Sequence, residues 1–377
     1  MNKEKIINIL KNAAAIVVFC ALLTIILYQN RDRDIFGLRA KETGNEPGSA
    51  QTRSDIAGDG ASGDICRVGD GVAVITPNSF SVLNIKGEGK PREIAMPSPV
   101  ISGTGDYVVY HNSDDKEAFV CKRERLRYSV KTDNRIIRAK VTHGGYSVIV
   151  TEKEGYSSEI IVYDGGGDAV FKWDVSKSEF LDADADPDRS RVALSQLSAG
   201  DSGIEGEIVL LDMKEAKVLQ KKTFKGKLFY NIKFNRNGTY TALGSDSLAY
   251  FNRDGSVKWE KKYGDRTLLK ADISQPDMMV LAFSAAGSGV KGNSTELEVV
   301  GRLGKVTAKR TMNGLADAVS VSGSEIAAAF GKKVYVMNNG LKTERKLEAG
   351  SSVKKLEFFG DNKHLFVLGN SGGEIME

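Results

Sequence analysis

The feature that most constrains this chain is a repeated pattern of short apolar runs that end in Asp or Asn. Clear copies occupy residues 160–164, 208–212, 248–252 and 334–338. A turn follows each run, often with Gly as in Asp254-Gly255, and a second short strand comes after it. Because Asp and Asn tolerate tight turns and Gly supplies a positive φ, the pattern predicts β-hairpins.

A second kind of short strand leads into a different turn. Strands of this kind occupy residues 183–185, 232–234, 271–273 and 356–358. They run into turns such as Asp186-Pro187-Asp188, and an apolar strand follows each turn. Each repeat therefore contains four strands. No long amphipathic helical stretch appears after Asp64, which indicates an all-β domain.

The spacing of the repeats predicts the architecture. Hairpin turns recur near residues 88, 123, 166, 215, 254, 303 and 340, at intervals of 35 to 49 residues. Four-stranded propeller blades repeat every ~40–50 residues, and closure of the ring removes exposed sheet edges. Residues 353–377 supply strands of one more blade, which a strand from near Asp64 would complete. We therefore expect an all-β propeller of four-stranded blades, eight in number, with seven as the alternative.

The N-terminal region predicts a membrane anchor. Residues 12–30 carry no charge, and 13–28 are almost wholly apolar, long enough for a helix across the ~30 Å hydrocarbon core. The run ends without the small residues of a signal-peptidase site, so we expect an uncleaved transmembrane signal-anchor helix. Basic residues flank both ends of the run. Because the head at 1–11 is short, we expect it in the cytoplasm and the C-terminal part outside.

Two further segments are expected after the anchor. Residues 31–63 contain Gly-rich and Ser-rich stretches and few large apolar side chains, which predicts a flexible polar linker. From Asp64 onward short apolar runs dominate, so the predicted propeller domain spans 64–377. The expected location is the cell membrane, with one pass and an extracytoplasmic propeller.

Charge and cysteine content exclude two classes of protein. The chain has 53 Lys and Arg against 49 Asp and Glu, and the resulting charge of +4 is too small and too dispersed to indicate nucleic-acid binding. Three cysteines cannot form a disulfide scaffold. We expect Cys66 and Cys121 to be buried thiols, while an exported domain would also permit a disulfide between them.

Two motifs resemble known sites but lack the rest of the chemistry. Residues 369–373 (GNSGG) match the nucleophile loop of some serine proteases, yet only four residues follow them. Alternating Asp residues from Asp182 to Asp188 resemble the start of an EF-hand loop, but Pro187 and Ala193 stand where Gly and Glu are required. On a strand, Asp182 and Asp184 would share one face, which leaves a nonspecific calcium site as an alternative. We otherwise expect no catalytic, metal-binding or cofactor-binding residues and no enzymatic activity.

The repeats resemble those of known propellers. The segments 164–173 and 254–259, which end in Trp, look like quinoprotein-like (PQQ-like) repeats, and the turns at 186–188 and 237–238 look like WD40-like turns. The order of head, anchor, linker and propeller resembles an uncharacterised family of single-pass envelope propellers of Gram-positive bacteria. This resemblance implies a membrane-anchored propeller domain of unknown function and no known activity. The sequence lacks the cofactor and metal constellation of true quinone enzymes.

Alignment of the repeats on their turns places six polar residues in one register. They are Lys140, Asp184, Lys233, Asp272, Ser320 and Glu357. Each lies between apolar neighbours, so on innermost strands these residues would line or flank the central channel. Their mixed signs favour pairing between neighbouring blades over a ligand site.

Two similar Gly-rich and Ser-rich segments join second to third strands and are candidates for a binding rim. They span residues 198–206 and 284–292. Loops at this place in a propeller open on one rim, and they are either tolerated insertions or partner-binding loops. The candidate residues in and beside them are Asp201, Glu205, Lys291 and Asn293.

These features favour a non-catalytic interaction platform. The anchor, the spacer and the repeats predict a propeller that binds a protein or polymer of the bacterial cell envelope. The alternative is an envelope ligand sensor, or an enzyme that uses the propeller channel with a metal or quinone cofactor.

Overall fold

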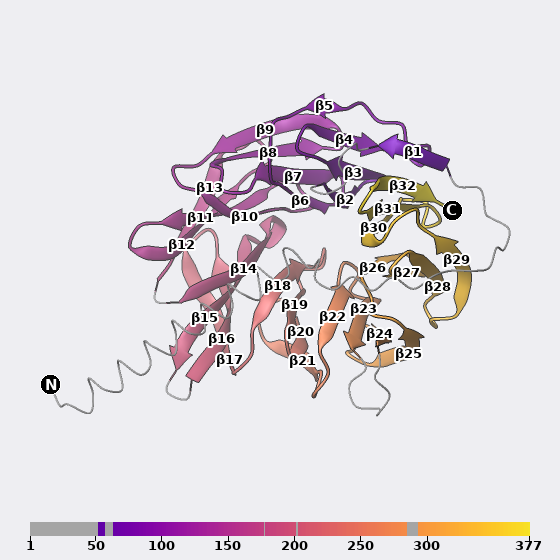
Figure 1. Ribbon diagram of the computed structural model, residues 1–377. Helices are drawn as coiled ribbons and strands as arrows, with labels where there is room; N and C mark the ends of the chain where they lie inside the picture. The colour runs from indigo at the N-terminus through magenta and orange to yellow at the C-terminus, as the bar shows by residue number, and fades with distance from the viewer. Residues whose placement is uncertain (1–51, 57–62, 177, 201–202, 285–292) are drawn as a thin grey trace, which may run out of the picture. The chain divides into compact units, whose positions relative to one another are not determined.

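The computed structural model describes residues 52–56, 63–176, 178–200, 203–284 and 293–377. These residues form 32 β-strands and one short 3-10 helix, η1 (Pro187–Arg189). The strands make eight antiparallel sheets of four strands each, arranged around a central axis (Figure 1). The predicted eight-bladed propeller of four-stranded blades is therefore confirmed.

The first four blades follow one another along the chain. Blade 1 contains β2 (Asp64–Val68), β3 (Gly71–Ile75), β4 (Ser79–Leu83) and β5 (Arg92–Glu93). Blade 2 contains β6 (Pro99–Thr104), β7 (Tyr107–Asn112), β8 (Glu117–Lys122) and β9 (Arg125–Lys131). Blade 3 contains β10 (Ile136–Val141), β11 (Ser147–Lys153), β12 (Tyr156–Tyr163) and β13 (Ala169–Val175). Blade 4 contains β14 (Glu179–Asp186), β15 (Arg191–Gly200), β16 (Gly203–Asp212) and β17 (Lys217–Lys225).

The next four blades complete the ring. Blade 5 contains β18 (Phe229–Phe234), β19 (Tyr240–Gly244), β20 (Ser247–Phe251) and β21 (Val257–Lys262). Blade 6 contains β22 (Leu268–Asp272), β23 (Met279–Ser284), β24 (Ser294–Val300) and β25 (Val306–Asn313). Blade 7 contains β26 (Ala318–Ser322), β27 (Glu325–Phe330), β28 (Lys333–Asn338) and β29 (Thr343–Glu348). Blade 8 contains β30 (Val353–Phe358), β31 (Leu365–Gly369), β32 (Gly372–Met376) and β1 (Thr52–Ile56).

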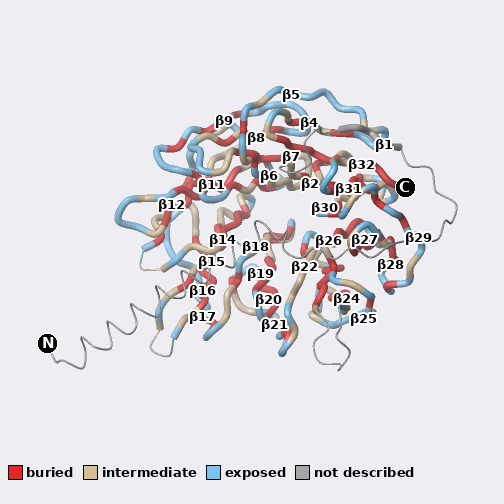
Figure 2. The backbone as a smooth tube through the Cα atoms, viewed as in Figure 1, coloured by how far each residue is buried: buried red, intermediate tan, exposed pale blue. Residues whose placement is uncertain are grey.

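Within each of blades 1 to 7 the chain runs from the axis outward. The first strand lies next to the axis, where it contacts first strands of adjacent blades, and the fourth strand lies at the periphery. The middle strands are buried from end to end, as in β19 and β20. The outermost strands are mostly exposed, as in β17 (Figure 2). The core therefore lies between neighbouring sheets, where each sheet buries both faces.

The ring closes with a strand from upstream of blade 1. β1 pairs antiparallel with β32, so blade 8 takes its outermost strand from the N-terminal side of the domain. The expected closure by a strand from the N-terminal side is confirmed, but the strand lies upstream of Asp64, which begins the innermost strand of blade 1. β1 lies instead within the segment 31–63 that was expected to be a linker. Because the fourth strand of blade 8 comes from elsewhere in the chain, blade 8 has no hairpin between its third and fourth strands. The eight blades therefore contain seven such hairpins.

Neighbouring blades are also joined at their outer strands. Trp259 on β21 donates a hydrogen bond from Nε1 to the carbonyl of Arg302 in the next blade, at 2.8 Å. Gly304 lies beneath the indole with a φ of 75°, and a Cβ there would come within 2.7 Å of the ring. Glycine is thus required at this position both for its backbone conformation and for the close approach of the ring.

The head at 1–11, the anchor at 12–30 and most of the linker at 31–63 lie outside the described residues. Among the residues that the structure describes, no helix has the length and apolar character to cross a membrane.

Candidate functional site

Five blades carry a β-bulge at the same place, near the start of the innermost strand. In each, two residues of the first strand oppose one residue of the second. The extra residues are Ile137, Leu181, Tyr230, Leu269 and Lys354. A bulge leaves its extra residue without a partner in the neighbouring strand, and these innermost strands all begin at the same end of the propeller. The bulges therefore present one residue per blade around one axial end of the propeller.

Four of these residues are apolar and lie in the consecutive blades 3 to 6. Ile137 and Tyr230 are 44% and 43% exposed, and Leu181 and Leu269 are partly buried. Val100 occupies the matching place on β6 of blade 2 without a bulge, and it is 39% exposed. We refer to these five residues as the apolar arc. Apolar groups gathered at one exposed place on a soluble domain mark a binding surface, whereas scattered ones do not.

The residue after each bulge adds charge beside the apolar arc. Arg138, Lys270 and Lys355 are exposed cations at this position in blades 3, 6 and 8. In blade 4 the position holds Asp182, which is fully buried and lies 3.3 Å from Nε of Arg138. Lys270 forms no ion pair with any described residue. The axial end thus combines apolar side chains with exposed charges of both signs, because Glu179 at the start of β14 is also exposed.

Two acids of the predicted polar register cap the strands of the following blade. Asp184 accepts a hydrogen bond from the backbone N–H of Phe234 at 2.7 Å, and Asp272 accepts one from Val321 at 2.8 Å. An innermost strand has a free edge, so its N–H groups need partners from elsewhere. These carboxylates therefore join blade 4 to blade 5 and blade 6 to blade 7.

Asp182 makes the same kind of joint and was not among the predicted register residues. Its Oδ2 accepts hydrogen bonds from the backbone N–H of Ile232 at 2.6 Å and from Nζ of Lys140 at 2.5 Å. Lys140 also donates to the carbonyl of Ile232 at 2.8 Å. The signal was present, since Asp182 shares a strand face with Asp184, two residues further on. Both acids and Lys140 connect blades 3, 4 and 5.

The other register residues show electrostatic coupling but no further ion pair in the described part of the chain. Burial, and then the carboxylate of Asp272, raise the pKa of Glu357 to about 8, while Lys355 and Lys233 oppose the rise. Burial also raises the pKa of Asp184, against the nearby charge of Lys140. Ser320 is buried, with 2% of its surface exposed. The structure therefore couples Lys140 to Asp184, and both Lys233 and Asp272 to Glu357.

The expected loop at 198–206 is largely a β-hairpin, which corrects the prediction. β15 and β16 stay paired to the last described residues, Gly200 and Gly203. The Gly-rich composition suggested a loop, but a Cβ at Gly206 would lie 2.0 Å from the carbonyl oxygen of Lys227. Glycine is needed there for close packing rather than for a loop. The hairpin extends from the same end of the sheets as the apolar arc, because second strands end where first strands begin.

The four rim candidates have different surroundings. Glu205 lies in β16, paired in register with Ser198 and Lys225 on its two sides. Asn293 accepts a backbone hydrogen bond from Gly314 at 2.6 Å. Asp201 and Lys291 lie outside the described residues.

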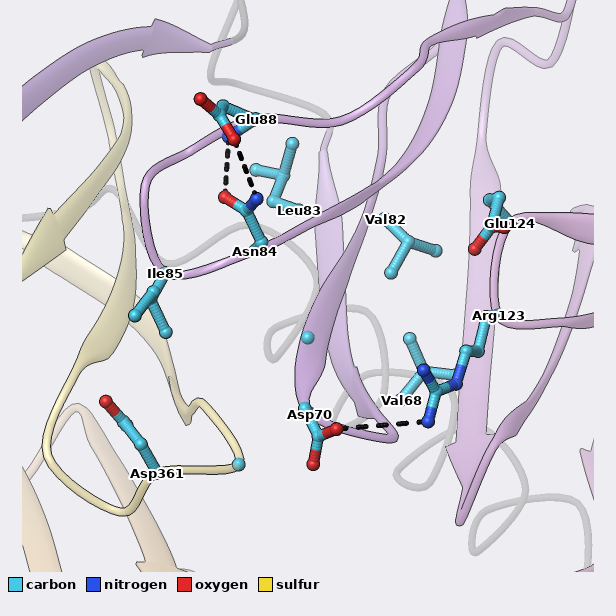
Figure 3. Close-up of a pocket in the computed structure, with 12 residues that line it drawn as sticks. Val68, Asp70, Val82, Leu83, Asn84, Ile85, Glu88, Arg123, Glu124 and Asp361 are labelled. Carbon is cyan, nitrogen blue, oxygen red and sulfur yellow. Dashed lines mark hydrogen bonds and ion pairs between the residues drawn. The ribbon is translucent and has the colours of Figure 1, made fainter.

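A pocket of about 530 Å³ lies at the opposite end of the sheets, where blades 8, 1 and 2 meet. Figure 3 shows Asp70 facing Arg123, 3.9 Å away, and Asn84 bound to Glu88. Asp361 comes from blade 8 and accepts a hydrogen bond from the backbone N–H of His364, whose ring also contacts the Asp361 carboxylate. Most charged side chains of this pocket therefore already have polar partners. The sequence did not predict this pocket, because its lining residues come from both ends of the propeller domain, which closure of the ring brings side by side.

The described residues contain no group of three or more His, Cys, Asp or Glu side chains that could hold a metal ion. Cys66 and Cys121 are both free thiols, so the structure contains no disulfide between them. Burial raises the pKa of each thiol.

Comparison with known proteins gives a family and a fold. The model of a family described as "Family of unknown function (DUF5711)" matches residues 48–377. No curated protein matches the chain.

Three solved structures are similar in fold at low sequence identity. The crystal structure of BamB from Moraxella catarrhalis has a TM-score of 0.53 at 14% identity, covering 86% of this chain and 96% of that one. The C-terminal WD40 domain of Sif2 has a TM-score of 0.58 at 12% identity, covering 81% and 92%. A structure described as the eukaryotic initiation factor has a TM-score of 0.53 at 14% identity, covering 86% and 82%. These likenesses establish the propeller fold.

Proposed function

The chain belongs to the DUF5711 family of unknown function, and we propose that its propeller is a non-catalytic interaction platform of the bacterial cell envelope. The observation that carries the proposal is the apolar arc, in which five consecutive blades each place an apolar side chain around one axial end.

The apolar arc offers binding energy as well as shape. Complete burial of a Leu-sized or Ile-sized side chain contributes about 1.5–3 kcal/mol. Val100, Ile137 and Tyr230 are 39%, 44% and 43% exposed, so covering all three contributes about 2–4 kcal/mol. That is enough for a hot spot within an interface, where a few central side chains carry most of the affinity.

A protein partner fits this surface better than a polymer does. Envelope polymers built of sugars and phosphates lack the large apolar groups that would cover aliphatic and aromatic side chains. A protein surface supplies such groups together with polar ones at the rim. We therefore propose a protein as the partner, and a polymer becomes an alternative outcome of the test.

The proposed location rests on the sequence. The apolar run at 13–28 has the length of a membrane-spanning helix, and the short head precedes it. In our proposal this helix anchors the chain in the cell membrane and the propeller lies on the extracytoplasmic side.

The test is capture of partners with full-length chain from chemically crosslinked cells. We compare the wild-type chain with a variant carrying Ile137→Ser and Tyr230→Ser. The matched control carries Val218→Ser and Leu303→Ser, exposed apolar residues at the opposite ends of the sheets. We expect a reproducible protein partner that the arc variant loses and the control keeps. A partner set that is identical for all three chains, or a polymer in place of a protein, contradicts the proposal.

A further inference from the structure

The hairpins between the third and fourth strands of blades 4, 5 and 6 form one continuous surface at the end of the propeller opposite the apolar arc. Gly255 of the blade 5 hairpin packs on Gln220 of β17, where a Cβ would come within 2.9 Å of the Gln220 side chain. Gly304 of the blade 6 hairpin packs on Trp259 of β21 in the same way. We call this surface the basal rim, and it comprises residues 212–219, 252–258 and 301–306.

The basal rim exposes large apolar side chains. Leu303 is 68% exposed, more than any other large apolar residue in the described part of the chain. Val218 and Val306 are 47% and 40% exposed, and Leu219 is exposed as well. Lysines on an outermost strand can be explained as protection of the sheet edge against pairing, but that role does not require exposed apolar side chains. Their presence indicates a surface that another structure covers.

The basal rim also carries positive charge that no acid neutralises. Its exposed cations without an ion pair to any described residue are Lys214, Arg253, Lys258 and Lys305. They lie on all three hairpins, so the charge is spread along the rim. The rim has six cations and three acids in total.

The acids on and near the rim do not remove this excess. On the rim, Glu215 pairs with Lys217, while Asp212 and Asp254 accept hydrogen bonds from the backbone N–H groups of their own turns. The turns between first and second strands of the same blades are balanced, since they hold Asp188 and Asp277 against Arg189 and Arg236. The blade 3 hairpin at 164–168 holds two acids, so the excess of positive charge ends at blade 4.

From this arrangement, and resting on the membrane anchor of the proposed function, we infer that the basal rim docks on an anionic lipid surface. The apolar side chains enter the boundary between headgroups and acyl chains, and the cations contact the lipid phosphates. A soluble polyanion would pair with the same cations but would leave Leu303 uncovered. A bilayer surface offers phosphate and hydrocarbon side by side and therefore covers both kinds of side chain.

The place where the chain enters the propeller supports this occupant. Thr52, the first residue of β1, pairs with Ile375 near the end of β32, whereas Ile56 pairs with Gly373 near its start. Third strands end where the hairpins to the fourth strands begin, so Thr52 lies at the same end of the propeller as the basal rim. Docking at this end turns the apolar arc away from the bilayer, where a protein partner can reach it.

The experiment measures how close the basal rim lies to lipid headgroups in the full-length chain. The chain is reconstituted into liposomes of phosphatidylcholine alone or with added phosphatidylglycerol, both containing a lipid with a nitroxide-labelled headgroup. A fluorescent noncanonical amino acid stands in place of Leu303 or, as the control at the arc end, in place of Tyr230. In anionic liposomes we expect quenching at position 303 to exceed that at position 230 roughly threefold, and to fall as salt is raised.

Two pairs of variants separate charge from apolar contact, and each has a matched control at the arc end. Lys258→Glu with Lys305→Glu should reduce quenching at position 303 by roughly half or more, whereas Lys270→Glu with Lys332→Glu, an equal change of charge, should leave it unchanged. Val218→Ser with Val306→Ser should also reduce quenching, whereas Val100→Ser with Ile137→Ser should not.

The outcomes separate this inference from the proposed function, because the liposomes contain no partner protein. If positions 303 and 230 are quenched equally, or if the rim charge variant has no effect, the inference is wrong and the protein-partner proposal stands. If the charge variant abolishes quenching but the apolar variant does not, the rim is a polyanion-binding surface and lipid docking is wrong. If position 230 is quenched more strongly, or if the chain does not float with either liposome, the proposed function fails as well. Equal melting temperatures of the variants exclude unfolding as the cause.

Discussion

Removal of the Asp182 carboxylate is expected to weaken the joint between three blades. Its Oδ2 accepts from the backbone of Ile232 at 2.6 Å and from Lys140 at 2.5 Å, and its Oδ1 lies 3.3 Å from Arg138. The side chain is completely buried. In Asp182→Ala, the Ile232 N–H loses its acceptor and two cations lose their counter-charge.

The expected cost is about 3 kcal/mol in the free energy of unfolding. Breaking a buried ion pair by removal of one partner costs about 3–5 kcal/mol. The side chains of Lys140 and Arg138 are 16% and 43% exposed, so water partly solvates the abandoned charges and places the cost at the lower end. Asp182→Asn keeps an acceptor for Ile232 but removes the charge, so we expect roughly half of that loss.

Guanidinium unfolding, followed by the fluorescence of Trp173 and Trp259, measures the change. These residues lie in blades 3 and 5, on either side of blade 4. Asp188→Ala, an exposed position beside the same strand, is the control, and we expect it to change stability by less than ~0.5 kcal/mol. If Asp182→Ala costs no more than this control, the carboxylate does not hold the blades together and our reasoning is refuted.

Three further changes test other parts of the structure. Burial raises the pKa of Glu357 from 4.5 to about 8, so stability falls as pH rises across that range. Glu357→Gln should flatten this slope in urea titrations and add up to about 4 kcal/mol at pH 8, and an unchanged slope argues against the burial. Burial lowers the pKa of His143 from 6.5 to about 4, so stability falls as pH falls through that range. His143→Gln should remove this loss in thermal melts at pH 4. A loss of the same size in His143→Gln would contradict the assignment to His143. Gly304→Ala should lower the free energy of unfolding by about 1–3 kcal/mol more than Gly264→Ala, because only the Cβ at position 304 meets the ring of Trp259. Equal losses in guanidinium unfolding would rule out that contact.

The repeat was predictable because hairpin turns are local. An apolar run, Asp or Asn, and a following Gly specify a turn within a few residues, and each turn predicted from this pattern joins a third to a fourth strand. The closing strand was not predictable in the same way. β1 pairs with β32 at the far end of the chain, and its sequence, Thr-Arg-Ser-Asp-Ile, carries no apolar run.

The candidate site was only partly predictable for a related reason. Alternation along strands placed Asp184 and Asp272 on one face, but the pattern could not show that they bind the backbone of the next blade. The sequence did not predict the apolar arc, because a bulge adds one residue to a strand and the sequence pattern does not show which residue is the extra one. Pairs such as Leu268 and Leu269 look like part of an ordinary buried run, and only the pairing register reveals that one of them is extra.

The central claim is that a protein partner binds at the apolar arc. Site-specific photo-crosslinking tests it most directly, with p-benzoylphenylalanine in place of Tyr230 and, as the control, in place of Leu303 at the opposite end of the sheets. After irradiation of cells that express the full-length chain, we expect a discrete crosslinked protein from position 230 and none from position 303. Crosslinks that are absent at position 230, or equal at both positions, would contradict the claim.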